Sequence, residues 1–77
     1  MITEKERVVS LFGEAIKLKR MEMHLSQRDV AQLTGITHVH IGHIERGMKE
    51  PSITIALRLC DTLDIDINDL IATLKTP

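Results

Sequence analysis

The stretch SQRDVAQLTGITHVHIGHIERG, residues 26–47, has the pattern of two short helices joined by a tight turn. Ser26 can cap the first helix, and Asp29 three residues later completes a capping box. Gly35 stands where the chain must turn sharply, because a residue without a Cβ atom takes a positive φ at little cost. Thr37 can then cap the second helix. The stretch therefore predicts a helix, a glycine turn and a second helix.

Apolar residues mark the side of each helix that we expect to pack on the core. On the first helix they are Val30, Ala31 and Leu33, and on the second they are Ile41 and Ile44, which share a face. The other face of the second helix is rich in hydrogen-bond donors and poor in acids. It carries Thr37, His38, Val39, Gly42, His43 and Arg46. A second helix that is anchored by its back and presents such a face is the arrangement that enters a DNA major groove.

This stretch resembles the helix-turn-helix of the phage Cro-and-repressor (Xre-like) family. The resemblance runs from about Leu11 to Leu70, and its most specific part is the spacing from Gln27 through Gly35 to Ile41. The matching residues are Ser26, Gln27, Val30, Ala31, Gly35, Ile36, Ile41, Ile44, Glu45, Arg46, Gly47, Pro51 and Ser52. The resemblance implies an all-α fold, a compact five-helix lambda-repressor-like DNA-binding domain.

The region before this stretch is predicted to be helical. Thr3 and Glu6 have the spacing of another capping box, and apolar residues recur at helical spacing from there to Met23. Gly13 is expected to weaken this helix by about 1 kcal/mol relative to alanine. A single helix and a short leader followed by a helix are both compatible with the pattern. The resemblance makes residues 1–9 an extension that lengthens the first helix, contacts a partner subunit or frays.

Two further helices are predicted after the stretch. Ser52 can cap a helix of about residues 53–63, and Asp66 can cap a short last helix. The apolar residues of these helices are Ala56, Leu59, Cys60, Leu63, Ile67, Leu70, Ile71 and Leu74. His24 and Asp64 stand at turns where the family has glycine, so we expect the turn at His24 to differ. The predicted divisions are an extension at 1–9, a DNA-binding domain at 10–74 and a tail at 75–77.

The composition favours one small globular domain and excludes several classes of function. The chain has 77 residues, of which 43% are hydrophobic and 27% charged, and its net charge is −1. Phe12 is the only aromatic residue, which argues against single-strand binding by base stacking. Cys60 is the only cysteine, which excludes an internal disulfide. No signal peptide, membrane span or catalytic constellation is visible, so we expect a cytoplasmic protein that is not an enzyme and needs no cofactor.

Binding to duplex DNA requires contacts that read bases and contacts that hold phosphates. The positions that match the family's base-facing residues are His38, Val39, Gly42 and His43. Histidine can donate to guanine, valine can meet a thymine methyl group, and glycine permits close approach of the backbone. Phosphate contacts are expected from Gln27, Arg28, Thr37, His40, Arg46 and Lys49. The combination on the reading face is unusual for the family, so the target DNA sequence does not carry over.

The resemblance also implies two contacts within the protein. Arg20 stands where the family has an arginine paired with the glutamate that matches Glu45, and this pair ties the first helix to the end of the recognition helix. The family's counterpart of Gln27 braces the first residue of the recognition helix. We expect both contacts to position the helices.

A metal site among the histidines is not expected. His38, His40 and His43 are separated by two, three and five positions, whereas helical ligands share a face at a separation of four. No Cys, Asp or Glu joins them at a spacing typical of zinc sites. We therefore predict no metal ligands in this chain.

These observations predict a sequence-specific, double-stranded DNA-binding transcriptional regulator. The resemblance implies a repressor that acts as a homodimer on a two-fold operator, with dimer contacts from the last helix or from residues 1–9. It is equally compatible with a restriction-modification controller, or with an antitoxin that has a toxin as protein partner. The near-neutral charge leaves a different class open, an adaptor module that binds protein rather than DNA.

Overall fold

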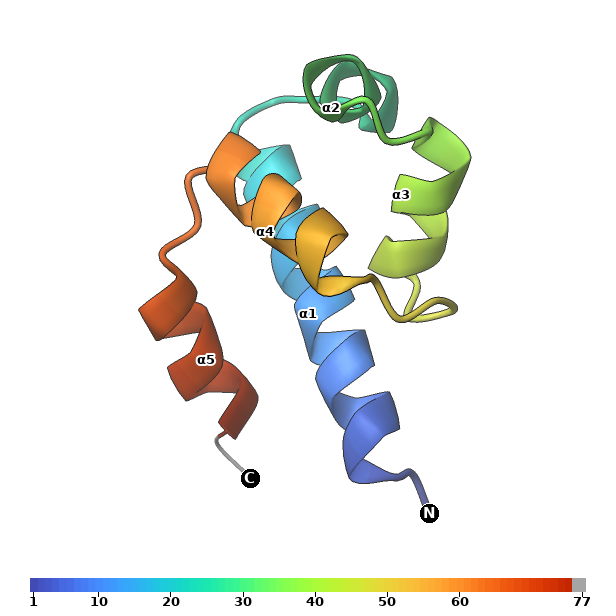
Figure 1. Cartoon of the computed structure of the whole chain (residues 1–77), viewed down its shortest axis with the longest axis vertical. Coiled ribbons are helices and arrows are strands. Elements are labelled where there is room, and N and C mark those ends of the chain that lie inside the picture. Colours follow the sequence, from blue (N-terminus) through green and yellow to red (C-terminus); the bar gives the residue numbers. More distant parts are fainter. Residues whose placement is uncertain (76–77) are drawn as a thin grey trace.

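Five helices follow one another along residues 1–75, the part of the chain that the computed structural model describes, and no strand occurs among them (Figure 1). In chain order they are α1 (Glu4–Glu22), α2 (Gln27–Thr34), α3 (His38–Glu45), α4 (Ile53–Thr62) and α5 (Ile67–Lys75). The predicted all-α, five-helix fold is confirmed. Lys75 is the last residue of α5, and the rest of the predicted tail lies outside the described residues.

A side chain caps the start of each helix, and these caps are Thr3, Ser26, Thr37, Ser52 and Asp66. In the capping boxes of α1 and α2, the carboxylates of Glu6 and Asp29 accept the backbone N–H of the cap residue at 3.0 and 2.8 Å. The hydrogen bond from that N–H is the main reason why the pKa of each carboxyl group lies below its usual value. Local hydrogen bonds therefore set the starts of the helices as predicted.

Residues 4–9 of the predicted extension belong to α1, and Thr3 caps it. This helix runs without interruption through residues 4–22, so the structure supports one helix over a separate leader. Arg7 Nη2 donates to the backbone carbonyl of Leu74 at 2.7 Å, which joins the start of α1 to the end of α5. The two segments lie at the same end of the molecule in Figure 1. The extension thus lengthens α1 and holds α5 against it.

Each of the four connections between helices has a residue with positive φ, and in the loop after α3 it is Gly47, with φ 71°. Gly35 has φ 77°, as the sequence predicts. His24 has φ 58° and Asp64 has φ 54°, although neither is glycine. The expectation that the turn at His24 departs from this geometry is wrong, because aspartate and histidine are among the side chains that the left-handed region tolerates.

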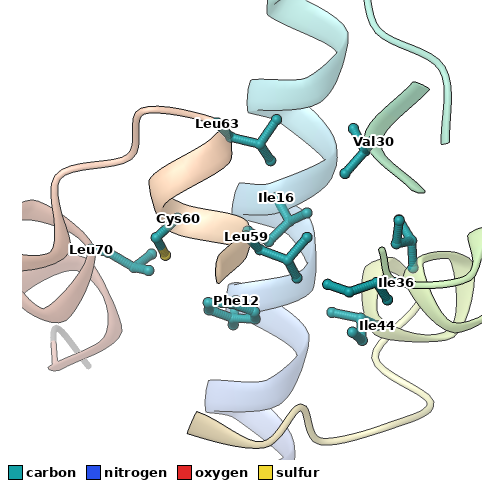
Figure 2. Packing of buried hydrophobic residues seen from close by; sticks show 10 residues of the cluster. Phe12, Ile16, Val30, Ile36, Ile44, Leu59, Cys60, Leu63 and Leu70 are labelled. Atoms are coloured by element: carbon teal, nitrogen blue, oxygen red, sulfur yellow. The ribbon is translucent and has the colours of Figure 1, made fainter. Parts of the chain in front are cut away.

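The core lies between α1 and the four shorter helices. Figure 2 shows Ile16 of α1 and Leu59 of α4 near the centre, with Val30, Ile36 and Ile44 approaching from the helix-turn-helix side. Ile16, Val30, Ile41, Ile44, Leu59 and Leu63 are fully buried. Cys60 lies in the same core beside Leu70, and burial raises the pKa of its thiol. These residues form the apolar faces expected from their spacing.

Leu33 is a correction to the predicted core. Its residue surface is 63% exposed, whereas Val30 on the same helix is completely buried. Only one side of this eight-residue helix packs against the core, and Leu33 lies on the side that faces solvent. The apolar character of Leu33 did not show whether it faces the core or solvent.

Gly13 has a structural role that its effect on helix propensity does not reveal. It is buried in the middle of α1, where this helix crosses α3. A Cβ atom at this position would collide with the backbone carbonyl oxygen of Ile44. Because the obstacle is backbone rather than a movable side chain, the absence of a side chain at Gly13 permits the close contact of α1 and α3.

We therefore expect Gly13→Ala to destabilise the protein, although alanine is the better helix former. Overpacking at the crossing should lower the free energy of unfolding by about 1–3 kcal/mol, measured by urea denaturation. Lys17→Ala, at an exposed position of the same helix, is the matched control and should change it by less than about 0.5 kcal/mol. A Gly13→Ala protein at least as stable as the unaltered chain would contradict this role.

Candidate nucleic-acid interface

The stretch that decides the fold forms α2, a turn and α3. Gly35 ends α2 in the left-handed conformation and donates its N–H to the carbonyl of Ala31 at 2.8 Å. The buried hydroxyl of Thr34 donates to the carbonyl of Val30 and accepts the N–H of Ile36, so it spans the turn. These contacts hold the turn in one conformation, from which α3 leaves in a new direction (Figure 1).

The inner side of α3 is anchored in the core while its outer side is open. Ile41 and Ile44 are completely buried. Val39 is 53% exposed, and His38 and His43 are partly exposed. Three of the four predicted base-contact residues are therefore accessible on α3. The fourth, Gly42, is buried.

An open groove between α2 and the start of α3 collects several predicted site residues. It is lined by nine residues, and four of these are Arg28, Thr37, His38 and Val39. Arg28 and Thr37 are exposed, so a cation and a hydroxyl stand beside the first two residues of α3. The groove thus joins predicted phosphate contacts to predicted base contacts.

A buried ion pair connects α1 to the end of α3. Arg20 Nε and Nη2 donate to the two carboxylate oxygens of Glu45 at 2.7 and 3.0 Å, and the two side chains are only 12% and 2% exposed. Hydrogen bonding to the carboxylate raises the pKa of Arg20. Arg20 also donates to the carbonyl of Leu25 at 2.8 Å, which ties in the loop before α2. The predicted pair is present, and it joins three segments of the chain.

Gln27 extends this network from α2 to α3. Its Nε2 atom donates to Glu45 Oε1 at 3.0 Å. The prediction that Gln27 braces the first residue of α3 is therefore wrong in its partner, because the amide reaches the last residue of that helix. Glu45 has become the acceptor for both Arg20 and Gln27, which fixes the orientation of the carboxamide.

The side chains of Gln27 and Arg46 end beside Gly42. A Cβ atom on Gly42 would lie 3.3 Å from Arg46 Nη1 and 3.3 Å from Gln27 Oε1. The ends of two long side chains therefore cover this glycine. This packing accounts for the absence of a side chain at position 42 without any contact with DNA. Among residues 1–75, Arg46 forms no ion pair, and its Nε donates to the sulfur of Met48 at 3.5 Å.

The remaining predicted residues stand apart from these clusters. Lys49 is exposed in the loop after α3, and His40 is partly exposed in the first turn of that helix, where its backbone N–H donates to the hydroxyl of Thr37. Within the described part of the chain, no three His, Cys, Asp or Glu side chains are placed to hold a metal ion. Also within that part, no helix is long and apolar enough to cross a membrane.

Residues 16–70, which include all of α2, α3 and α4, match the family described as Helix-turn-helix. The chain belongs to this helix-turn-helix family. The resemblance predicted from the sequence is thereby confirmed.

Two curated proteins, one from a phage and one from a bacterium, are similar to this chain. The ImmF control region 10 kDa protein of Bacillus phage phi105 is 34% identical over 58 residues, which are 75% of this chain and 64% of that protein. An uncharacterised HTH-type transcriptional regulator of Mycobacterium tuberculosis is 27% identical over 53 residues, 69% of this chain and 38% of that protein. The chain thus spans less than two thirds of the length of these curated relatives.

A solved structure shares the fold. It is the restriction-modification controller protein C.AhdI from Aeromonas hydrophila, with a TM-score of 0.74 and 32% identity, over 80% of this chain and 94% of that chain. These similar proteins are described as control proteins and transcriptional regulators rather than as enzymes.

Removing one partner of the buried pair should be costly for this helix-turn-helix. Arg20→Ala leaves the buried carboxylate of Glu45 without its cation, so we expect the free energy of unfolding to fall by about 3–5 kcal/mol in urea denaturation. Lys19→Ala is the matched control, because it removes a surface ion pair with the exposed Glu22 at 3.6 Å, which should cost about 1 kcal/mol or less. Equal losses in the two variants would show that the buried pair does not hold α1 to α3.

Proposed function

We propose that this protein binds double-stranded DNA in a sequence-specific manner and represses transcription. The observation that carries the proposal is α3, whose back is fixed by Ile41 and Ile44 while Val39 and two histidines remain accessible on its outer side. The groove residues Arg28 and Thr37 would hold phosphates beside this face. Membership of the helix-turn-helix family supports the same function.

The proposal includes a homodimer on a two-fold operator. The sequence predicts dimer contacts from residues 1–9 or from the last helix. The hydrogen bond between Arg7 and Leu74 joins these two segments. α5 also exposes Ile67 and Ile71, apolar residues that a second copy would cover. A symmetric dimer would present its two α3 helices to half-sites about one helical turn apart.

A controller of a restriction-modification operon is the second candidate. The observation that favours it is the likeness to the controller protein C.AhdI, which extends over 94% of that chain. Both candidates require operator binding by α3, and the neighbouring genes distinguish them. An antitoxin would likewise be revealed by a toxin gene beside it.

Selection of bound sequences from random duplex DNA tests the proposed function. We expect recovery of a palindrome with half-sites about one turn apart, bound with an affinity that falls steeply between 50 and 200 mM salt as phosphate contacts are lost. The control is the same selection with Arg28→Ala, which should show a smaller salt dependence. Weak binding at every salt concentration, with no sequence recovered, would instead favour a protein-binding adaptor.

His43 is proposed to read a base. His43→Ala should weaken binding to the selected sequence by about 1–3 kcal/mol per half-site and relax the preference at one base position. His24→Asn is the control, since His24 is an exposed histidine in the turn after α1 and asparagine tolerates its positive φ. An unchanged footprint and affinity for His43→Ala would remove this residue from the reading face.

A further inference from the structure

The side chains around Gly42 have an arrangement that the proposed function does not yet explain. Gly42 lies on α3 between its outer face and the first turn of α2, and it is buried although it has no side chain. What buries it are the polar ends of Gln27 and Arg46, each 3.3 Å from the position of an added Cβ atom. The site therefore brings a carboxamide from α2 and a guanidinium from the end of α3 to one point.

The protein holds these two side chains to different degrees. The amide of Gln27 is fixed by its bond to Glu45 at 3.0 Å, and Glu45 is fixed in turn by Arg20. Its Oε1 atom is the end nearer to Gly42, at 3.3 Å against 3.6 Å for Nε2. Arg46 is exposed, and within residues 1–75 its side chain forms one hydrogen bond, from Nε to the sulfur of Met48, so its terminal nitrogens are available to an anion.

The charges at this point favour an anion at Arg46. The carboxylate of Glu45 is already compensated by two hydrogen bonds from Arg20 and is only 2% exposed. Arg46 has no acidic partner within residues 1–75. An uncompensated guanidinium at the open edge of a helix pair is suited to a phosphate, which it can bind through two parallel hydrogen bonds.

We propose that Gly42 is a positioning residue, which lets the guanidinium of Arg46 fold back over α3 beside the fixed amide of Gln27 and bind a DNA phosphate from there. The inference rests on the proposed function and changes the role predicted for Gly42 from the sequence. The glycine acts through Arg46 and does not itself approach a base. A methyl group at this position would lie 3.3 Å from Arg46 Nη1, so the guanidinium would have to shift by a few tenths of an ångström, because Gln27 is fixed and Arg46 is not.

A double-mutant cycle on the full chain tests the inference. Gly42→Ala should weaken binding to a duplex of scrambled sequence about two- to tenfold, because a phosphate contact does not depend on sequence. In an Arg46→Ala background, Gly42→Ala should have no further effect, since its target is already missing. Lys49→Ala is the matched control, a nearby exposed cation that does not touch Gly42, and in that background the full loss should persist.

Stability is measured on the same proteins without DNA. Alanine is a better helix former than glycine, so Gly42→Ala should raise the Tm by about 4–8 °C while it weakens binding. This opposite movement separates a lost contact from a damaged fold. The salt dependence of Arg46→Ala should fall by about one ion per subunit.

Each other outcome has a distinct meaning. An equal loss for Gly42→Ala in the Arg46→Ala and Lys49→Ala backgrounds would show that Gly42 meets DNA directly, which overturns the inference while the proposed function stands. Unchanged binding by Gly42→Ala would overturn it as well. If the unaltered chain binds no duplex at any salt concentration, the proposed function fails and the inference falls with it.

Discussion

The buried ion pair between Arg20 and Glu45 is the interaction on which the recognition helix depends. It joins α1 to the last residue of α3 through two hydrogen bonds, while a third from Arg20 holds the loop before α2. Because removing charges from water costs free energy, such a pair contributes more to the placement of helices than to net stability. Gln27 uses the same carboxylate, so one acidic side chain sets the relative positions of α1, α2 and α3.

The close crossing of α1 and α3 complements this pair. Gly13 removes the side chain that would meet the carbonyl of Ile44, and the two isoleucines of α3 then reach the core beside Ile16. The polar pair and the apolar contact lie at successive turns of α1, and they hold the adjacent residues Ile44 and Glu45 of α3 against it. The outer face of α3 takes no part in these contacts and stays accessible, which suits a helix that enters a groove.

Local features of this structure could be predicted, and long-range ones could not. The caps at Thr3, Ser26 and Thr37 and the turn at Gly35 depend on hydrogen bonds between residues at most four apart, so their spacing identifies them. Leu33 was misplaced because apolar character does not say which edge of a short helix meets the core. The partner of Gln27 is 18 residues away, so no local pattern could identify it.

The sequence by itself determined the five helices, their order and the membership of the helix-turn-helix family, because these follow from local capping, periodicity and a specific spacing. Only the tertiary structure decided what the two glycines of α1 and α3 do. Gly13 is small because a carbonyl of another helix lies against it, and Gly42 is small because Gln27 and Arg46 share the space above it. The physical reason is the same at both positions. A missing side chain is explained by the atoms that fill its place, and the carbonyl of Ile44 and the amide of Gln27 come from other helices that only folding brings near.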